Sequence, residues 1–475
     1  MMKRGRPVGP GRTENLVCAS QTLPCGWITF QVVKSGIAMA LTLVFVLTSR
    51  AESHPVGFGG ASATDWVVTN SFPATNEITF DQFLKEVAQA NLDYAAQRYN
   101  VSIAEASVAA AKVFPNPTLG LTGGFDVTQS GSERLPSTAG AALTQTLELG
   151  GKRKYRILGA RQSYAATAAT LDGFLRNLKL DAAGAFADAL ALARSAEQKR
   201  QSAEYLRRLA ETQRARLRAG DISQADLLQT QVEQQQFQNE VLAAQGDAEK
   251  AAEALAGFLG RNRGQTVLIP KGSLETTNRQ FDVSRLLADA LRTRPDLVAL
   301  RHTRDAAQSK FHEEKANRIP NVDVGAAVTH STDSENSIAP SPEFNSLGLT
   351  LSLPIPLWNR NEAAIATARY AAEQAHTQLQ AAELKTEVQL RQAFTSYQSA
   401  VERVGNYQSG ILKDADALLE AKRLSYQRGQ SSLLELLDAQ RTDNEVRSSH
   451  NSALADKAKA LIELQRAAGI WDIQF

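Results

Sequence analysis

The chain has 475 residues, of which 43% are hydrophobic and 21% are charged. This composition excludes a mainly disordered protein, and the length exceeds that of one ordinary domain. The 52 basic and 50 acidic residues give a formal charge of +2, which argues against a nucleic-acid-binding protein. The chain's two cysteines, Cys18 and Cys25, are too few for a disulfide-stapled scaffold.

Residues 1–51 have the pattern of a secretory signal peptide. A basic segment precedes the apolar run 36–48, and the small residues Ser49 and Ala51 mark a cleavage site. The run is shorter than the roughly 20 residues of a membrane-spanning helix, so a permanent anchor is the weaker interpretation. Removal of this segment leaves 46 basic and 49 acidic residues and no cysteine or methionine. The exported chain would then hold no disulfide and no soft metal ligand.

After an N-terminal extension, residues 52–76, the chain repeats itself. Residues 114–117 (FPNP) return as 319–322 (IPNV), and residues 218–223 (RAGDIS) return as 427–432 (QRGQSS). We predict two structural repeats, residues 77–270 and 271–475. Each has the order helix, two strands, long helix, helix.

The helices are predicted from length, alanine content and apolar spacing. Residues 152–219 contain no proline, and leucines and alanines recur there at alternating steps of four and three. The counterpart of this long helix is 361–428. Shorter helices are expected at 223–259 and 432–468, and leading helices at 80–113 and 282–319. Small residues on the apolar stripe, such as Ala182, Ala185 and Ala189, favour a closely packed cylinder of helices.

Four stretches alternate with the period of a strand, at residues 118–127, 139–149, 321–330 and 346–355. Each is about 10 residues long, the length with which a tilted strand crosses a bilayer. Four strands cannot close a barrel in lipid, where every backbone group must be paired. Two copies would supply 8 strands, and three would supply 12 with room for a channel. The predicted fold is therefore mainly α with membrane β, completed in a homo-oligomer.

The ends of the long helices form tight turns. Each helix stops at a glycine, Gly220 or Gly429, which can adopt the left-handed conformation that ends a helix. The next helix starts at a capping box headed by Ser223 or Ser432. An exposed tip at the end of a long rod is a candidate docking surface, and this interpretation is favoured over a plain turn because the sequence repeats the same design twice.

Three segments carry a resemblance to a known family: 147–153 (LELGGKR), 354–360 (PIPLWNR) and 426–441 (YQRGQSSLLELLDAQR). In this order of elements, residues 77–470 resemble the TolC-like outer membrane efflux proteins. Residues 148–153 are most similar to the branch that serves heavy-metal (CzcC-like) pumps of the resistance-nodulation-division (RND) type. Channels for drugs or organic molecules share the same skeleton.

The resemblance implies a homotrimer in the outer membrane of a Gram-negative cell, with a 12-stranded barrel and a 12-helix periplasmic tunnel. It implies three further partners: a periplasmic adaptor protein, an inner-membrane RND transporter and outer membrane lipid. The channel would be a passive gated conduit, neither an enzyme nor a cofactor protein. The six histidines are scattered along the sequence, so we expect them to be surface residues and not metal ligands. Channels for drug efflux or type I protein secretion remain alternatives. A secreted coiled-coil scaffold is weaker, since it needs no matched strands.

The resembling family narrows its tunnel near the tips with acidic residues. The matching positions here are Glu435 and Asp438, which stand on adjacent turns of one helix face. Three copies would place six carboxylates around the pore and attract cations. Glu435 can instead cap Ser432, so Asp438 is the better candidate. Some members carry an arginine where Ser431 stands here, which puts a salt-bridge lock in doubt.

Basic residues follow the strands at the expected periplasmic side of the barrel. Lys152 and Arg153 stand at the start of a helix, where a positive charge opposes the helix dipole, so another benefit is expected. We interpret these two residues and Arg360 as contacts for lipid phosphates, with Trp358 as an interfacial aromatic residue. Plain solvation, or pairing with an acid of a neighbouring subunit, is the alternative.

Overall fold

The structure is a computed structural model, which describes residues 77–124, 136–260, 268–275, 278–334 and 340–473. The chain divides into two units, residues 1–71 and 72–475, and every described residue lies in the second unit. The expected signal peptide and N-terminal extension lie outside the described residues. Among the described helices, none combines the length and apolarity that crossing a membrane requires.

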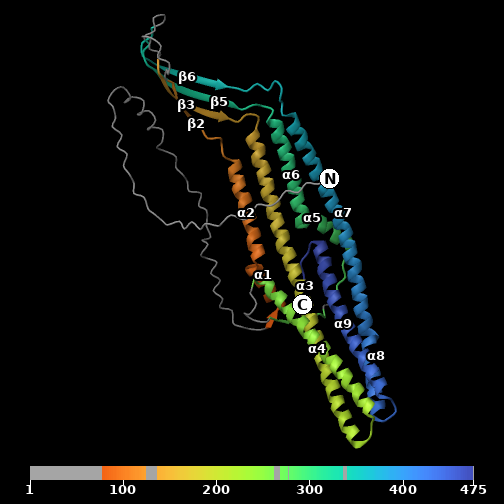
Figure 1. Cartoon of the computed structure of the whole chain (residues 1–475). Coiled ribbons are helices and arrows are strands. Elements are labelled where there is room, and N and C mark those ends of the chain that lie inside the picture. Colours follow the sequence, from red (N-terminus) through yellow and green to blue (C-terminus); the bar gives the residue numbers. More distant parts are fainter. Residues whose placement is uncertain (1–76, 125–135, 261–267, 276–277, 335–339, 474–475) are drawn as a thin grey trace, which may run out of the picture. The chain divides into compact units, whose positions relative to one another are not determined.

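The two halves of the second unit follow one plan (Figure 1). The elements of the first half are β1 (Glu77–Thr79), α1 (Phe80–Ala90), α2 (Leu92–Ala111), β2 (Thr118–Gly124), β3 (Thr138–Leu147), α3 (Lys152–Ala219) and α4 (Gln224–Phe258). Those of the second half are β4 (Ile269–Lys271), α5 (Val283–Thr293), α6 (Pro295–Ala316), β5 (Val322–Ser331), β6 (Phe344–Ser352), α7 (Glu362–Asn406), the π-helical segment η1 (Tyr407–Ile411), α8 (Leu412–Gln427) and α9 (Leu433–Ala468). The expected boundary between the repeats falls inside β4.

The long helices have the expected positions. Helix α3 has 68 residues and is about 100 Å long at 1.5 Å per residue. Its counterpart is continuous from α7 through η1 to α8, where the π-helical turn brings Tyr407 to 5.8 Å from the ring of His450 on α9. Helices α2 and α4 both lie against α3, and α6 and α9 both lie against α7. Two shorter helices thus accompany each long one, as the repeat predicts.

The leading helices differ from the prediction, because each is broken into two. Asn91 is extended (φ −68°, ψ 121°), and its side chain accepts a hydrogen bond from the backbone of Tyr94 at the start of α2. In the second half, Pro295 begins α6 and forces the preceding Arg294 out of the helical region. Uninterrupted apolar spacing therefore hid a cap in one half, and a proline marks the break in the other.

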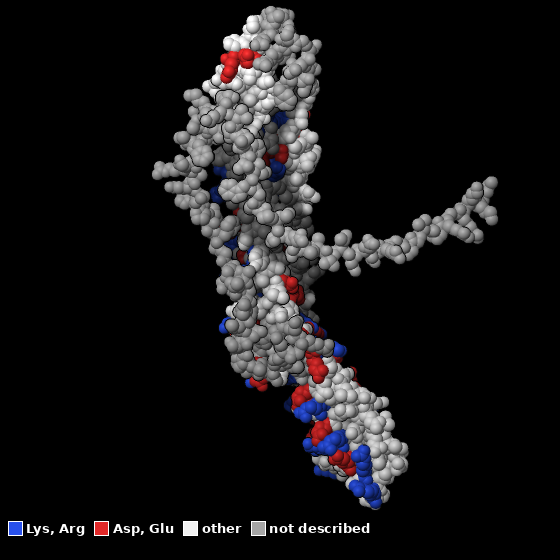
Figure 2. Space-filling view, turned by 60° about the vertical axis from the view of Figure 1, so that its left-hand side comes forward, with Lys and Arg blue, Asp and Glu red and all other residues white. Residues whose placement is uncertain are grey.

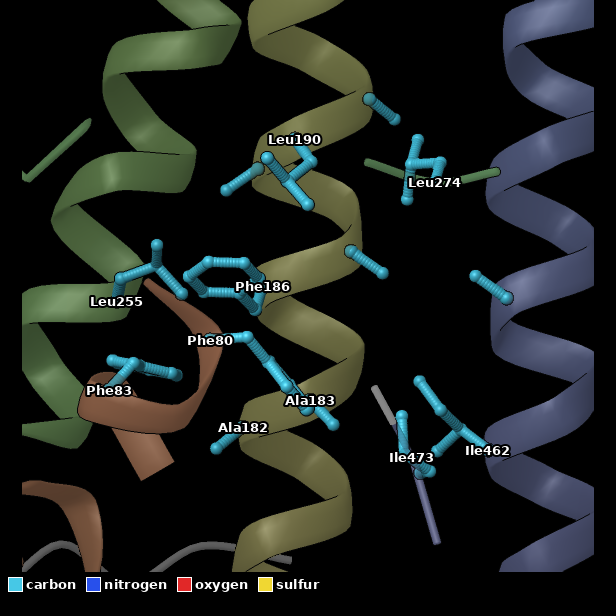
Figure 3. Packing of buried hydrophobic residues seen from close by; sticks show 14 of the residues in the cluster. Phe80, Phe83, Ala182, Ala183, Phe186, Leu190, Leu255, Leu274, Ile462 and Ile473 are labelled. Carbon is cyan, nitrogen blue, oxygen red and sulfur yellow. The ribbon is translucent and has the colours of Figure 1, made fainter. Parts of the chain in front are cut away.

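The largest core cluster lies where the short helices meet α3. The rings of Phe80 and Phe83 lie 5.4 and 5.5 Å from that of Phe186, and Leu255 of α4 is fully buried beside them (Figure 3). Ile462 of α9 belongs to the same cluster, so it joins both halves. Burial of such side chains stabilises the packing by about 2 kcal/mol each.

A four-stranded antiparallel sheet has the order β2-β3-β5-β6. All four strands are predicted strands, although residues 125–127 of the first lie outside the described part. Strands β1 and β4 form a separate parallel pair that the sequence pattern does not predict, because three residues are too few to show a period. Among the described residues, the outer edges of β2 and β6 pair with no strand.

The register sorts the sheet's side chains into two different faces. One row of partners is Leu119, Leu143, Ala326 and Leu349, and the next is Leu121, Ala141, Val328 and Leu347. The opposite face carries mainly glycine, alanine, serine and threonine, as in the row Thr118, Thr144, Gly325 and Thr350, with Phe344 and Asp323 near its two ends. Leucines of the first face remain exposed, with Leu349 at 84%. The sheet is therefore apolar on one face and small and polar on the other.

Candidate functional site

The candidate docking tips are the turns of two helical hairpins, α3–α4 and α8–α9. Gly220 (φ 81°) and Gly429 (φ 72°) take the left-handed conformation that was predicted. The Ser223 hydroxyl accepts a hydrogen bond from the backbone of Asp226, and that of Ser432 accepts one from Glu435. Figure 2 shows basic and acidic side chains intermixed along the hairpin end of the face in view.

The candidate gate residues Glu435 and Asp438 both lie exposed on α9. Glu435 is not free, because the ammonium of Lys422 on α8 donates to its carboxylate at 2.5 Å. This bond, with the contacts to Ser432, holds the pKa of Glu435 below its ordinary value. In the described part of the chain, no side chain binds the Asp438 carboxylate. Of the two candidate carboxylates, Glu435 is therefore paired, whereas Asp438 has no hydrogen-bonded side-chain partner among the described residues and interacts electrostatically with Arg441.

Contacts that sequence reasoning missed link the two hairpins near these carboxylates. The hydroxyl of Tyr426 on α8 accepts hydrogen bonds from Gln213 at 2.5 Å and Arg216 at 3.0 Å, both on α3. Arg441 on α9 binds Glu233 on α4, with Nε donating at 2.8 Å. A salt bridge between the hairpins therefore exists, although it does not involve position 431. Its partners are 208 residues apart in the chain, so no local pattern reveals them.

A polar groove of about 440 Å³ lies between the hairpins beside this salt bridge. Its lining includes Ser195, Ser202, Glu233, Arg441, Asn444 and Ser448. Ser202 on α3 donates to Asn444 on α9 at 2.6 Å. Within the described ranges, histidine, cysteine and acidic side chains form no group of three that could hold a metal ion. Several separate polar contacts therefore link the two hairpins along this groove.

At the junction between sheet and helices, Lys152 departs from its expected role. Its side chain is buried, and its ammonium donates to the Asn321 side chain at 2.5 Å. Burial lowers the pKa of Lys152. The ammonium connects the start of α3 to the residue before β5, and it is not open to a lipid phosphate.

Arg153 and Arg156 explain why the first turn of α3 is basic. Arg153 donates two hydrogen bonds to the carbonyl of Lys112, at 2.8 and 3.0 Å, and stacks 4.1 Å above the ring of Phe114. Arg156 donates to the carbonyl of Ala111 and forms a bidentate pair with Glu148. These carbonyls form the C-terminal end of α2, whose dipole attracts positive charge. The positive charges of Arg153 and Arg156 are therefore unfavourable for the dipole of α3, at whose start they lie, but favourable for the dipole of α2, whose C-terminal end they contact.

The second junction uses different residues. Asn361 (φ 62°) precedes α7 in the left-handed conformation, and its amide donates to the carbonyl and the carboxylate of Glu314. Hydrogen bonds from Asn317, Asn361 and Lys310 lower the pKa of Glu314 to about 2. Trp358 is 94% exposed and Arg360 is also exposed. Both remain open to an external partner, as the interface hypothesis requires.

The chain is similar to proteins of known class over most of its length. It is 24% identical over 398 residues to the cobalt-zinc-cadmium resistance protein CzcC of Cupriavidus metallidurans, which covers 83% of this chain and 91% of CzcC. It is 24% identical over 422 residues to nodulation protein T of Rhizobium leguminosarum bv. trifolii, which covers 86% of this chain and 90% of the relative.

Solved structures share the fold. A crystal structure of CusC, whose description refers to transmembrane channel formation, matches with a TM-score of 0.70 at 18% identity, over 82% of this chain and 92% of CusC. The outer-membrane channel OprN matches with a TM-score of 0.68 at 17% identity, over 82% and 89% of the two chains. The model of the outer membrane efflux protein family matches residues 83–261 and 286–470, which lie in both repeats. The resemblance and the outer-membrane location inferred from it are confirmed, and the chain belongs to the outer membrane efflux protein family.

Proposed function

We propose that three copies of the chain form an outer-membrane channel of a tripartite efflux pump. The supporting observation is the sheet, which is apolar on one face, small and polar on the other, and open at β2 and β6. Edge pairing between copies satisfies the free backbone groups, as a lipid environment demands. Four strands from each of three chains make a barrel of about 12 strands, with lipid outside and a polar lumen inside.

The helices continue the same ring on the periplasmic side. Helices α2 and α4 lie at one edge of the helical layer, and α7 and α8 lie at the other, on the sides of β2 and β6. Each edge exposes apolar side chains, including Leu228 and Val232 on α4 and Leu418 and Leu424 on α8. A head-to-tail ring of copies covers both edges and closes with threefold rotation.

The tips and the carboxylates near them have separate roles in this proposal. The turns at Gly220 and Ser223 and at Gly429 and Ser432 dock a periplasmic adaptor protein, which connects the channel to an inner-membrane RND transporter. Asp438 supplies three unpaired carboxylates to the constriction of the trimer. These attract cations and lower the barrier to their passage. The channel itself performs no chemistry.

Heavy-metal cations are the proposed substrate. The similarity to a cobalt-zinc-cadmium resistance protein extends over most of both chains, and the free carboxylate favours cations. Residues 148–153, which carried the resemblance to heavy-metal systems, include the Glu148 that binds Arg156. This motif thus stabilises the junction, and the transporter rather than the channel selects the metal.

Single-channel recording in planar bilayers tests the gate. The Asp438→Asn variant is expected to reduce the preference for divalent cations over chloride, because it removes the unpaired charge while preserving side-chain size. Glu435→Gln is the matched comparison on the same helix face and should change selectivity less, since Lys422 already offsets that charge. Equal selectivity of wild type and Asp438→Asn would refute the gate assignment. Absence of any channel from the wild-type protein would refute the proposed function.

A further inference from the structure

We infer that the junction between β6 and α7 binds the phosphate group of an anionic phospholipid in the periplasmic leaflet of the outer membrane. The inference rests on the proposed function, because it requires the sheet to lie in that membrane. It moves the lipid contact away from Lys152 and Arg153, which bind groups of their own chain, to a set of exposed cations in the second half.

The apolar face of the sheet places the boundary of the hydrocarbon layer at this junction. Strand β6 ends at Ser352, and the apolar side chains continue through Leu353 and Ile355, which are 52% and 73% exposed. Trp358 follows with an indole that is 94% exposed. An aromatic residue at the end of an apolar band is typical of the interface between hydrocarbon and head groups.

Four cations surround this point. Two adjoining grooves of about 350 and 410 Å³ share Arg318, and their linings also include Lys315, Arg360 and Arg369. Glu362 is the single acidic residue that lines them within the described part of the chain. The grooves therefore carry a net positive charge next to exposed apolar surface.

The cations are only weakly engaged by the chain itself. The guanidinium of Arg360 has no partner among the described side chains. That of Arg318 lies 3.7 Å from the exposed carboxylate of Glu362 and donates a long hydrogen bond of 3.4 Å to the carbonyl of Arg360. The Lys315 ammonium lies 4.2 Å from the centre of the Phe311 ring. Arg369 pairs with Glu373, but both side chains are more than half exposed, so solvent screens the pair. A phosphate can therefore bind these side chains without first breaking strong contacts within the chain.

A second copy of the chain is a poorer occupant of the grooves, because it brings like charge. Strand β2 starts at the end of the sheet where β6 stops, and the residues just before it include the exposed Lys112. Arg153 lies beside Lys112, while Glu148, the nearby acid, is held by Arg156 at 2.6 Å. Among the residues that the structure describes, the opposite edge thus supplies no free carboxylate at this level, whereas a lipid phosphate matches guanidinium geometry and charge.

Lipid retention by the purified trimer tests the inference. The wild type and the Arg318→Gln/Arg360→Gln variant are titrated in detergent with phosphatidylglycerol or phosphatidylethanolamine, and bound lipid is counted by native mass spectrometry. We expect the double variant to bind phosphatidylglycerol about tenfold more weakly, since each basic residue near a membrane surface adds attraction for anionic lipid. Phosphatidylethanolamine, which has no net charge, should bind more weakly to the wild type.

The matched control is Lys250→Gln/Arg292→Gln, which removes two cations that are 79% and 76% exposed on α4 and α5. This control should retain phosphatidylglycerol as the wild type does. Equal retention by the junction variant would overturn the inference, and so would loss of the trimer in that variant alone, which would indicate a subunit contact. Failure of the wild type to form trimers or to conduct ions would instead overturn the proposed function.

Discussion

Tyr426 is one of the side chains that link the two hairpins. Its hydroxyl accepts hydrogen bonds from Gln213 and Arg216, and the Arg216 guanidinium lies 5.5 Å from the centre of its ring. Gln213 is fully buried, so its amide depends on this hydroxyl for satisfaction. An unpaired buried polar group costs about 1–3 kcal/mol. This one hydroxyl thus influences how readily the hairpins separate.

We predict that Tyr426→Phe increases the resting conductance of the channel in planar bilayers. The substitution keeps the ring but leaves the Gln213 amide nitrogen without its partner, which destabilises the contact between the hairpins. Tyr205→Phe is the control, because the structure records no hydrogen bond of that hydroxyl among the described residues and Tyr205, on α3, packs against the same hydrophobic cluster as Tyr426. Unchanged conductance in Tyr426→Phe would show that these bonds do not control ion passage.

At the scale of elements, each long helix is tied to its leading helix by polar contacts at the sheet junction. In the first half, arginines of α3 bind the carbonyls that end α2. In the second half, Glu314 of α6 binds Asn361, the residue that precedes α7. The two halves therefore connect the long helix to its leading helix with opposite charges: arginine side chains in the first half and a glutamate side chain in the second.

The anionic junction predicts acid sensitivity. The pKa of Glu314 is about 2 in the folded chain and 4.5 ordinarily, so the ionised carboxylate stabilises the fold fully above pH 4.5. This contribution is lost as the pH falls from 4.5 towards 2, because the unfolded chain binds the proton first. We expect the melting temperature, measured by circular dichroism, to fall less over this pH range in Glu314→Gln than in the wild type.

Glu105→Gln is the control for this measurement, because Glu105 is an exposed residue of α2 without a recorded partner in the described structure. The melting temperature of Glu105→Gln should fall with acid as that of the wild type does. If the melting temperature of Glu314→Gln fell as steeply as that of the wild type, the Glu314 carboxylate would not be the source of the acid sensitivity.

For the whole molecule, the two faces of the sheet predict opposite tolerance of charge. Leu349 and Thr350 are neighbours on β6 that point to opposite faces. Leu349→Arg should cost about 2–4 kcal/mol if its face meets lipid near the membrane centre, and should reduce the trimer recovered from outer membranes. Thr350→Arg should assemble and lower cation conductance, because its charge faces the lumen. Equal assembly of both variants would contradict the barrel.

Much of the architecture could be predicted because the relevant signals are local. Alternation of side chains predicts the four strands, and glycines followed by serine capping boxes predict both hairpin turns. The break at Asn91 is hidden by apolar spacing that continues through it, whereas Pro295 marks the break at Arg294 in the sequence. The hydrogen bond of Lys152 to Asn321 could not be predicted either, because the two residues are 169 positions apart in the chain.

The sequence by itself determined the family and the duplicated order of elements, because periodicity and repeats act over short stretches; that several copies complete one barrel stays a prediction, which follows from counting strands. Only the tertiary structure decided which charges are available. It pairs Glu435 with Lys422, buries Lys152, and leaves Asp438 and Arg360 exposed. Whether a charged side chain is free depends on what distant segments bring within about 3 Å of it, and local sequence does not contain that information.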